Sequence, residues 1–359
     1  MTNFRNRETL WAQLRAAELV QDELPAAGES PSPWYIKVLL AFSGWLAALF
    51  LMGFLAVAIE MLWREPVTGL VVGLLMIASA YGLLRIPRNE FVAHLALAIS
   101  LAGQGWVVFS LFDLLGNHPA GFWLLIGILQ VLLAWLMPNF IHRVFSSGAA
   151  ALAFSVALAS LHLPYLFSSA ILLGAAWLWL NEFRYPHHLQ MVHALGYGLV
   201  LALMILKGTT LFGQEMMIWH YRHNDQQPLT TPWMGEALNG LVALLIIWKL
   251  LQRYFTHLSQ GAPLIIMIGM LVLCLVSLEA HGIAAGMILL ILGFGSSNRV
   301  LLGLGIISLL FYISTYYYLL HTSLLHKSVS MLIIGIALLA WRWALITFSP
   351  AFREQHHEQ

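Results

Sequence analysis

Carboxylates and histidines at the edges of long apolar stretches are the residues of this chain best suited to chemistry. Asp113 follows one such stretch, and Glu236 opens another, with Asn239 one helical turn further on. Glu279 and His281 share a very short link between two others. Because an ionisable group near hydrocarbon is costly unless it is paired or hydrated, such groups commonly mark ion or proton pathways. The pattern predicts an outward-facing polar cavity that binds a cation or relays protons through carboxylate and imidazole groups.

These residues also fit a simpler interpretation, in which each one lies near a helix end and reaches water. A carboxylate such as Glu236 stabilises a helix N-terminus in any case, because it faces the positive end of the helix dipole. The sequence leaves both interpretations open.

A further group of polar residues follows a tyrosine-rich stretch near the C-terminus. Tyr317, His321 and Lys327 lie there, at the predicted outer boundary of the membrane. An aromatic belt with a lysine that extends its charge to water is one explanation. Pairing of Lys327 with an outer carboxylate is the other, because this lysine stands on the cation-poor side. All three are included as candidate substrate- or ion-binding residues.

Signatures of enzymes and metal sites are weak. His220, His223 and Asp225 have a spacing that could place zinc ligands on one helix face, but the segment lacks a fourth ligand and is expected to be a solvated loop. The single cysteine, Cys274, lies within an apolar stretch, and no serine-nucleophile or zinc-protease motif occurs. We predict no catalytic residue, no metal and no cofactor; an intramembrane transferase is the least favoured alternative.

The composition requires a lipid environment for the elements that carry these residues. Of the 359 residues, 60% are hydrophobic and only 9% are charged, whereas a soluble domain has about 25% charged residues. The net charge of +1 gives no reason to expect nucleic acid as a partner. The bilayer itself is the expected partner.

Apolar stretches recur at lengths close to the roughly 20 residues that a membrane-crossing helix needs. The fold class is therefore all-α, a polytopic transmembrane bundle of about twelve spans, with eleven or thirteen as alternatives. The expected spans are residues 35–58, 67–84, 91–112, 119–137, 144–161, 164–181, 189–206, 234–252, 262–279, 282–294, 298–319 and 327–346.

Lysine and arginine positions predict the orientation. With both termini in the cytoplasm, thirteen of these residues fall on the inner side and four on the outer side, which is a clear positive-inside bias. The outer four are Arg64, Lys207, Arg222 and Lys327. A missed or invented span would exchange every later loop, so the bias also supports the count of twelve.

The chain divides into three predicted parts. Residues 1–33 form a cytoplasmic tail with a short amphipathic helix and a proline- and serine-rich linker. Residues 34–346 form the transmembrane helical domain, and residues 347–359 form a polar C-terminal tail.

Two stretches resemble an uncharacterised bacterial family of multi-pass membrane proteins, which is known as a domain of unknown function. Thr322-Ser-Leu-Leu-His-Lys327-Ser328 is similar to a turn that follows a tyrosine-rich helix in that family, and residues 33–54 (PWYIKVLLAFSGWLAALFLMGF) are similar to its first span. The resemblance implies location in the bacterial inner membrane. It also implies a partner membrane protein with a GDYxxLxY motif, and it carries over no activity.

These observations predict an integral inner-membrane protein that acts as a carrier or as a component of a complex. Twelve spans, short loops and acid-base groups at membrane depth favour a carrier. An accessory or scaffold subunit for a partner membrane protein is the alternative.

Overall fold

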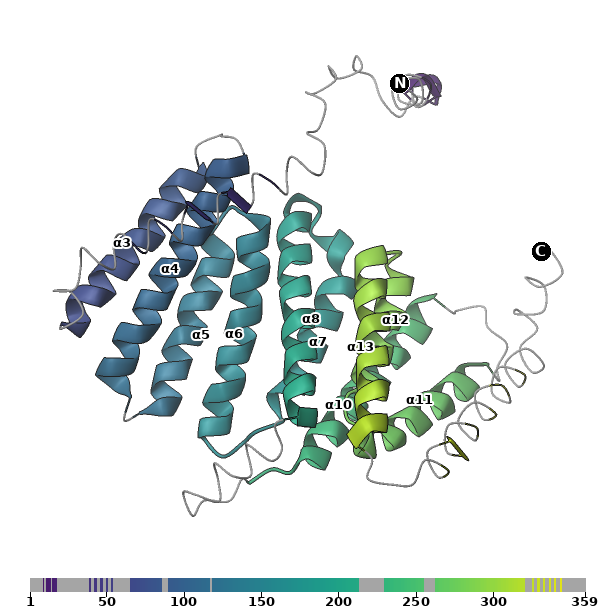
Figure 1. The fold of residues 1–359 in the computed structure, drawn as a ribbon. Helices are drawn as coiled ribbons and strands as arrows, with labels where there is room; N and C mark the ends of the chain where they lie inside the picture. The colour runs from purple at the N-terminus through teal and green to yellow at the C-terminus, as the bar shows by residue number, and fades with distance from the viewer. Residues whose placement is uncertain are drawn as a thin grey trace.

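The computed structural model describes residues 65–85, 90–116, 118–212, 229–254 and 262–319, together with isolated positions before residue 54 and between residues 325 and 343. All the regular structure in the continuous ranges is helical (Figure 1). The α-helices there are α3 (Pro66–Arg85), α4 (Glu90–Leu115), α5 (Pro119–Leu136), α6 (Phe140–Ser160), α7 (Phe167–Leu180), α8 (Leu189–Phe212), α10 (Pro232–Tyr254), α11 (Ala262–Glu279), α12 (Ile283–Gly295) and α13 (Arg299–Leu319).

The helices confirm the all-α class and correspond one to one with the ten spans expected between residues 67 and 319. In the described ranges, seven helices are long and apolar enough to cross a membrane, namely α3, α4, α5, α6, α8, α10 and α13. Helices α7, α11 and α12 are apolar but shorter. The first and last expected spans lie largely outside the described residues, so the count of twelve stays a prediction.

Local sequence explains where several helices begin. Pro119 and Pro232 open α5 and α10, where a missing N–H removes no helical hydrogen bond. Asn139 caps α6 by accepting a hydrogen bond from the His142 backbone N–H. The Asn298 side chain accepts from Val300 and Leu301 in the same way, as expected for a cap on α13.

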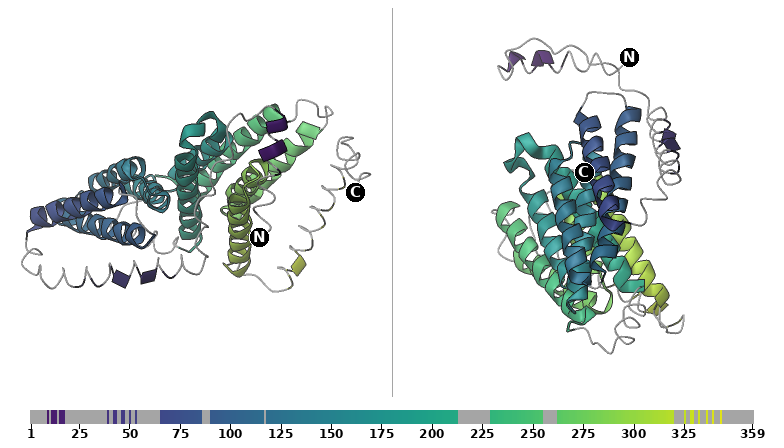
Figure 2. Two further views of the ribbon diagram at one scale, coloured as in Figure 1. Left: turned by 90° about the horizontal axis from the view of Figure 1, so that it is seen from above. Right: turned by 90° about the vertical axis from the view of Figure 1, so that its left-hand side faces the viewer.

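Neighbouring helices pack mainly in consecutive pairs, α3 with α4, α5 with α6 and α12 with α13, while α8 lies between α6 and α7 (Figures 1 and 2). Several pairs approach closely at glycines. A Cβ added to Gly73 would lie 2.7 Å from the Gly103 carbonyl oxygen, and one on Gly69 would lie 2.5 Å from Ser110 Oγ. Gly69 and Gly73, one helical turn apart, therefore allow α3 and α4 to pack closely.

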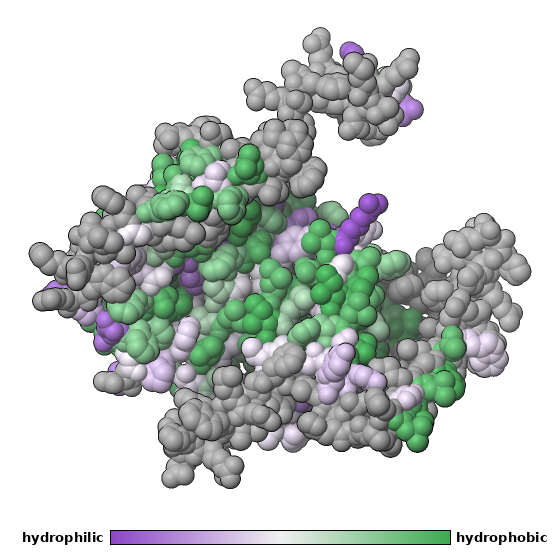
Figure 3. All heavy atoms as spheres, in the orientation of Figure 1, coloured by the Kyte–Doolittle hydropathy of each residue, from purple (hydrophilic) through white to green (hydrophobic). Residues whose placement is uncertain are grey.

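Hydrophobic side chains also cover much of the outer surface of the described helices, as Figure 3 shows for one face. Phe112, Trp135 and Leu271 are among the large apolar residues exposed there. A water-soluble protein rarely leaves such continuous apolar surface uncovered. The seven apolar helices and this surface make the chain a membrane-embedded protein.

Cationic residues gather at one end of the helices. Short connections make α3 to α8 run alternately, so that α3, α5 and α7 end where α4, α6 and α8 begin (Figure 1). The described lysines and arginines at that end are Arg85, Arg143, Arg184, Lys249, Arg253 and Arg299. In the described ranges, the opposite end has Lys207. We refer to the first as the cationic end. The opposite end, where Glu65, Asp113, Glu236 and Glu279 lie, is the acidic end.

Candidate functional site

A buried ion pair lies near the acidic end. Lys207, in the last two turns of α8, is 3% exposed, and Glu236, in the first two turns of α10, is 1% exposed. The lysine Nζ donates a hydrogen bond to Glu236 Oε1 over 2.5 Å. Each charge loses its hydration at this depth, and the partner at this short distance offsets part of that cost.

Two further helices complete the surroundings of the carboxylate. Ser277 Oγ on α11 donates to the second glutamate oxygen, Oε2, over 3.1 Å. The backbone N–H of Ala284, in the first turn of α12, donates to the same serine hydroxyl over 3.3 Å. Both carboxylate oxygens therefore have a partner, and α8, α10, α11 and α12 meet at one acidic group.

Asn239 lies one turn beyond Glu236 and is fully buried. Its Nδ2 donates to Ser168 Oγ on α7 over 2.9 Å and to the Gly235 carbonyl over 2.8 Å. Its Oδ1 has no hydrogen-bond partner among the described residues. An acceptor left open in a buried position is a place where a water, a proton donor or a cation can bind.

Tyr312 on α13 is the largest fully buried side chain in the described part of the chain, and its hydroxyl has no described partner either. Its ring packs against Gly282, where an added Cβ would lie 3.0 Å away. Gly282 has a φ of 94° in the turn between α11 and α12, a conformation that glycine adopts without strain. The tyrosine thus covers the turn that follows Ser277.

The structure brings Glu236 and Asn239 together but distributes the other candidates. Asp113 is exposed near the end of α4, a helix that packs against α3 and α5. Glu279 is exposed at the end of α11, and His281 is half-buried in the following turn, its Nδ1 buried without a described partner. Tyr317 is half-buried on α13, edge-on to the Tyr318 ring at 6.0 Å. His321 and Lys327 lie outside the described residues.

Sequence reasoning missed Lys207 as the partner of Glu236. The signal was present, because Lys207 is one of the four cations on the side where cations are scarce. The same argument was applied to Lys327 alone. Ser277 and Tyr312 carried no signal, since a serine or tyrosine in an apolar helix is common.

A second buried polar cluster, also missed, joins α4, α5 and α6. His142 is fully buried, with its Nε2 2.8 Å from Ser100 Oγ and 3.1 Å from Gln104 Nε2. Gln130 Nε2 donates to Gln104 Oε1 over 2.8 Å. Because the Gln104 amide donates to Nε2, the ring proton belongs on Nδ1, which faces Ser146 Oγ at 3.2 Å. This neutral network ties three helices together.

A third contact set lies near the cationic end. His193 Nε2 on α8 is 2.9 Å from Oε2 of the buried Glu182, and the Trp179 ring stacks on the histidine at 5.1 Å. Tyr197 donates to the Asn298 side chain over 2.9 Å. These contacts anchor the segment after α7 and the start of α13 to α8.

Among the described residues, no three His, Cys, Asp or Glu side chains gather in a way that could hold a metal ion. His220, His223 and Asp225, the weak zinc alternative, lie outside those residues.

Comparisons with known proteins give a family and no function. A family model described as a domain of unknown function (DUF4401) matches residues 33–347. No curated protein and no solved structure matches the chain.

Proposed function

This chain belongs to the DUF4401 family of unknown function, and from that premise we propose that it is an inner-membrane carrier that moves protons through the Lys207–Glu236 pair. The observation behind the proposal is a lysine and a glutamate that are paired and buried together among apolar helices. Ionisable groups in such a place are rare and commonly mark substrate, ion or proton pathways.

The contacts of the pair suit a carboxyl group that gains and loses a proton. While Lys207 is in contact, its ammonium offsets the negative charge of the carboxylate. When α8 moves away from α10, the carboxylate is left buried without a counter-charge, and binding a proton from water then removes its charge. Return of Lys207 expels that proton to water at the opposite surface of the membrane. Each cycle moves one proton on and off Glu236, with no other reactant.

The open acceptor at Asn239 supports the same role. Its Oδ1 lies one turn from Glu236 on α10 and can accept a hydrogen bond from an entering water or from a protonated substrate group. Helices α7, α8, α10, α11 and α12 all contribute side-chain or backbone groups to this neighbourhood, so a change in their packing alters every contact of the pair.

The test is proton movement into vesicles that contain the purified protein. A potassium gradient with valinomycin supplies an inside-negative potential, and trapped pyranine reports the internal pH. We expect wild-type vesicles to acidify faster than protein-free vesicles. Glu236→Gln should reduce the rate to that of protein-free vesicles, because an amide keeps the shape of the side chain but cannot take up the proton.

Glu279→Gln is the matched control, because Glu279 is an exposed carboxylate at the same end of the bundle. Its rate should stay within about twofold of wild type, as expected for an exposed surface substitution. Equal losses in the two variants would contradict a specific role for Glu236. Wild-type vesicles no faster than protein-free ones would rule out proton movement and would favour the accessory-subunit alternative.

A further inference from the structure

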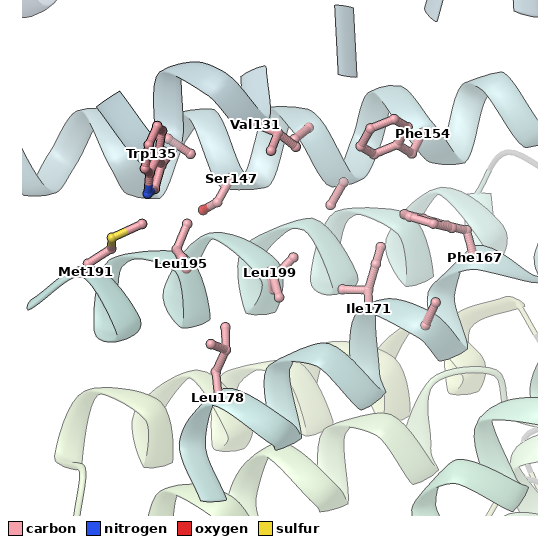
Figure 4. Close-up of a pocket in the computed structure, with 14 residues that line it drawn as sticks. Val131, Trp135, Ser147, Phe154, Phe167, Ile171, Leu178, Met191, Leu195 and Leu199 are labelled. Atoms are coloured by element: carbon pink, nitrogen blue, oxygen red, sulfur yellow. The ribbon is translucent and has the colours of Figure 1, made fainter. Parts of the chain in front are cut away.

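An apolar groove is lined by residues of α5, α6, α7 and α8, and neither Lys207 nor Glu236 is among them (Figure 4). Its volume is about 410 Å³. Ala134 on α5, with Ala150 and Ala151 on α6, forms much of its floor, and these small side chains leave the space open. Phe154 and Phe167, whose rings lie 6.0 Å apart, close one end.

The residues that line the groove indicate what kind of molecule it can hold. Thirteen of its fourteen residues are hydrophobic. The fourteenth is Ser147, whose hydroxyl already donates to the Val144 carbonyl over 3.1 Å. The groove therefore offers a hydrocarbon chain apolar contact and no free hydrogen-bonding group. Its rim is open, with Val131 and Trp135 about half exposed or more, 49% and 65%.

The other end of the groove, marked by Trp135 and Met191 in Figure 4, lies toward the cationic end of the bundle. Arg143 precedes Ser147 by four residues on α6, so it continues the groove-lining face by one turn. The arginine is half-buried, and its Nε is buried without a hydrogen-bond partner among the described residues. A guanidinium with an unused donor binds phosphate oxygens well.

The groove and Arg143 lie at the depths that the acyl chain and the headgroup of a membrane lipid occupy. From Phe154 to Arg143 the α6 axis spans roughly 16 Å, which places the arginine at the membrane boundary when the phenylalanines lie at hydrocarbon depth. Trp135 at the mouth has the ring type that prefers this boundary. We propose that the groove holds one acyl chain of an anionic phospholipid, whose phosphate binds Arg143.

The test measures lipid retention by the full chain purified in mild detergent. Equal amounts of dioleoylphosphatidylglycerol and dioleoylphosphatidylcholine are added, and bound lipid is counted by native mass spectrometry. Wild type should retain the anionic lipid in preference to the zwitterionic one. Arg143→Gln should lower retention of the anionic lipid about tenfold, the loss expected for one charge-assisted hydrogen bond.

Two further variants separate the parts of the proposal. Arg184→Gln removes an exposed cation at the same end that does not line the groove, and it should leave retention unchanged. Ala134→Phe fills the groove and should lower retention of both lipids. Size-exclusion chromatography shows whether each variant is folded and monodisperse.

The remaining outcomes contradict the proposal. Equal losses for Arg143→Gln and Arg184→Gln would mean that anionic lipid collects by general charge attraction. Radiolabelled inorganic phosphate that binds wild type and Ala134→Phe equally, and Arg143→Gln weakly, would mean a free-phosphate site without a tail. A wild-type protein that retains neither lipid would show that the groove does not bind a phospholipid.

Discussion

At the residue scale, the Lys207–Glu236 pair is the feature that departs most from its surroundings. Two opposite charges 2.5 Å apart stabilise each other strongly, but only as long as both are present. Removal of one partner leaves the other either charged without a counter-charge or neutralised by a change of protonation, and both states cost folding free energy. Ser277 offers a single hydrogen bond to the carboxylate, which is not enough to replace the ammonium.

We expect Lys207→Met to destabilise the protein by about 3–5 kcal/mol, because Glu236 then lacks its counter-charge. The double variant Lys207→Met/Glu236→Met should recover most of that loss, since both buried charges are gone and the volume is nearly kept. Thermal unfolding in detergent, followed by circular dichroism, compares the midpoints. A double variant as unstable as the sum of the two single variants would show that the two residues do not interact.

The residues of the site were only partly foreseeable. Glu236 and Asn239 stood out because the glutamate opens an apolar stretch and the asparagine follows it one helical turn later. Their partners depend on the orientation of α7, α8 and α11 about their own axes. The hydropathy of the sequence does not specify that orientation. Gln104, Gln130 and His142 were overlooked for the same reason, since each is a single polar residue in an apolar run and acquires meaning only when three helices align.

At the element scale, span boundaries followed closely from the sequence. Hydrophobic length and charges at the ends are local properties, so α3, α5 and α13 begin within two residues of their expected positions. Which helices touch is not a local property. The close approach of α6 and α8 at Gly148 and Gly198 joins one glycine from each of two helices, and nothing in the local sequence says that these two meet.

Gly198 should be the glycine least tolerant of a side chain. A Cβ there would overlap Ser147 Oγ and the Val144 carbonyl oxygen, and the latter belongs to the α6 backbone and cannot turn aside. We expect Gly198→Ala to destabilise the protein by about 1–3 kcal/mol. Gly105→Ala is the control, because no atom lies within 4 Å of its added Cβ. Equal midpoints of thermal unfolding for both variants would contradict close packing at Gly198.

At the scale of the whole molecule, the unequal distribution of cations predicts an orientation in the membrane. The cationic end should face the cytoplasm, because lysine and arginine are retained on that side during insertion. All the cations compared here lie between α3 and α13, so the predicted orientation does not depend on the expected first and last spans. It can be tested with labels placed on the described residues alone.

We expect a cysteine at Glu65 to react with a membrane-impermeant maleimide in intact spheroplasts, and a cysteine at Phe183 to react only after lysis. Both positions are exposed, and they lie at opposite ends of the helices. Cys274→Ala supplies the background, because Cys274 is the only native cysteine. The reverse labelling pattern would invert the orientation.

The thirteen-residue helix α12 gives the two sides of the membrane unequal access to the ion pair. A helix of that length measures roughly 20 Å, about 10 Å less than the hydrocarbon layer. The shortfall lies on the acidic side, because Gly282 packs against Tyr312, seven residues before the end of α13. The route to Ser277 and Glu236 is therefore short from the acidic end, whereas the route from the cationic end runs nearly the whole length of α12. Proton exchange should therefore be fast toward the exterior, and the inward step should limit the rate of each cycle.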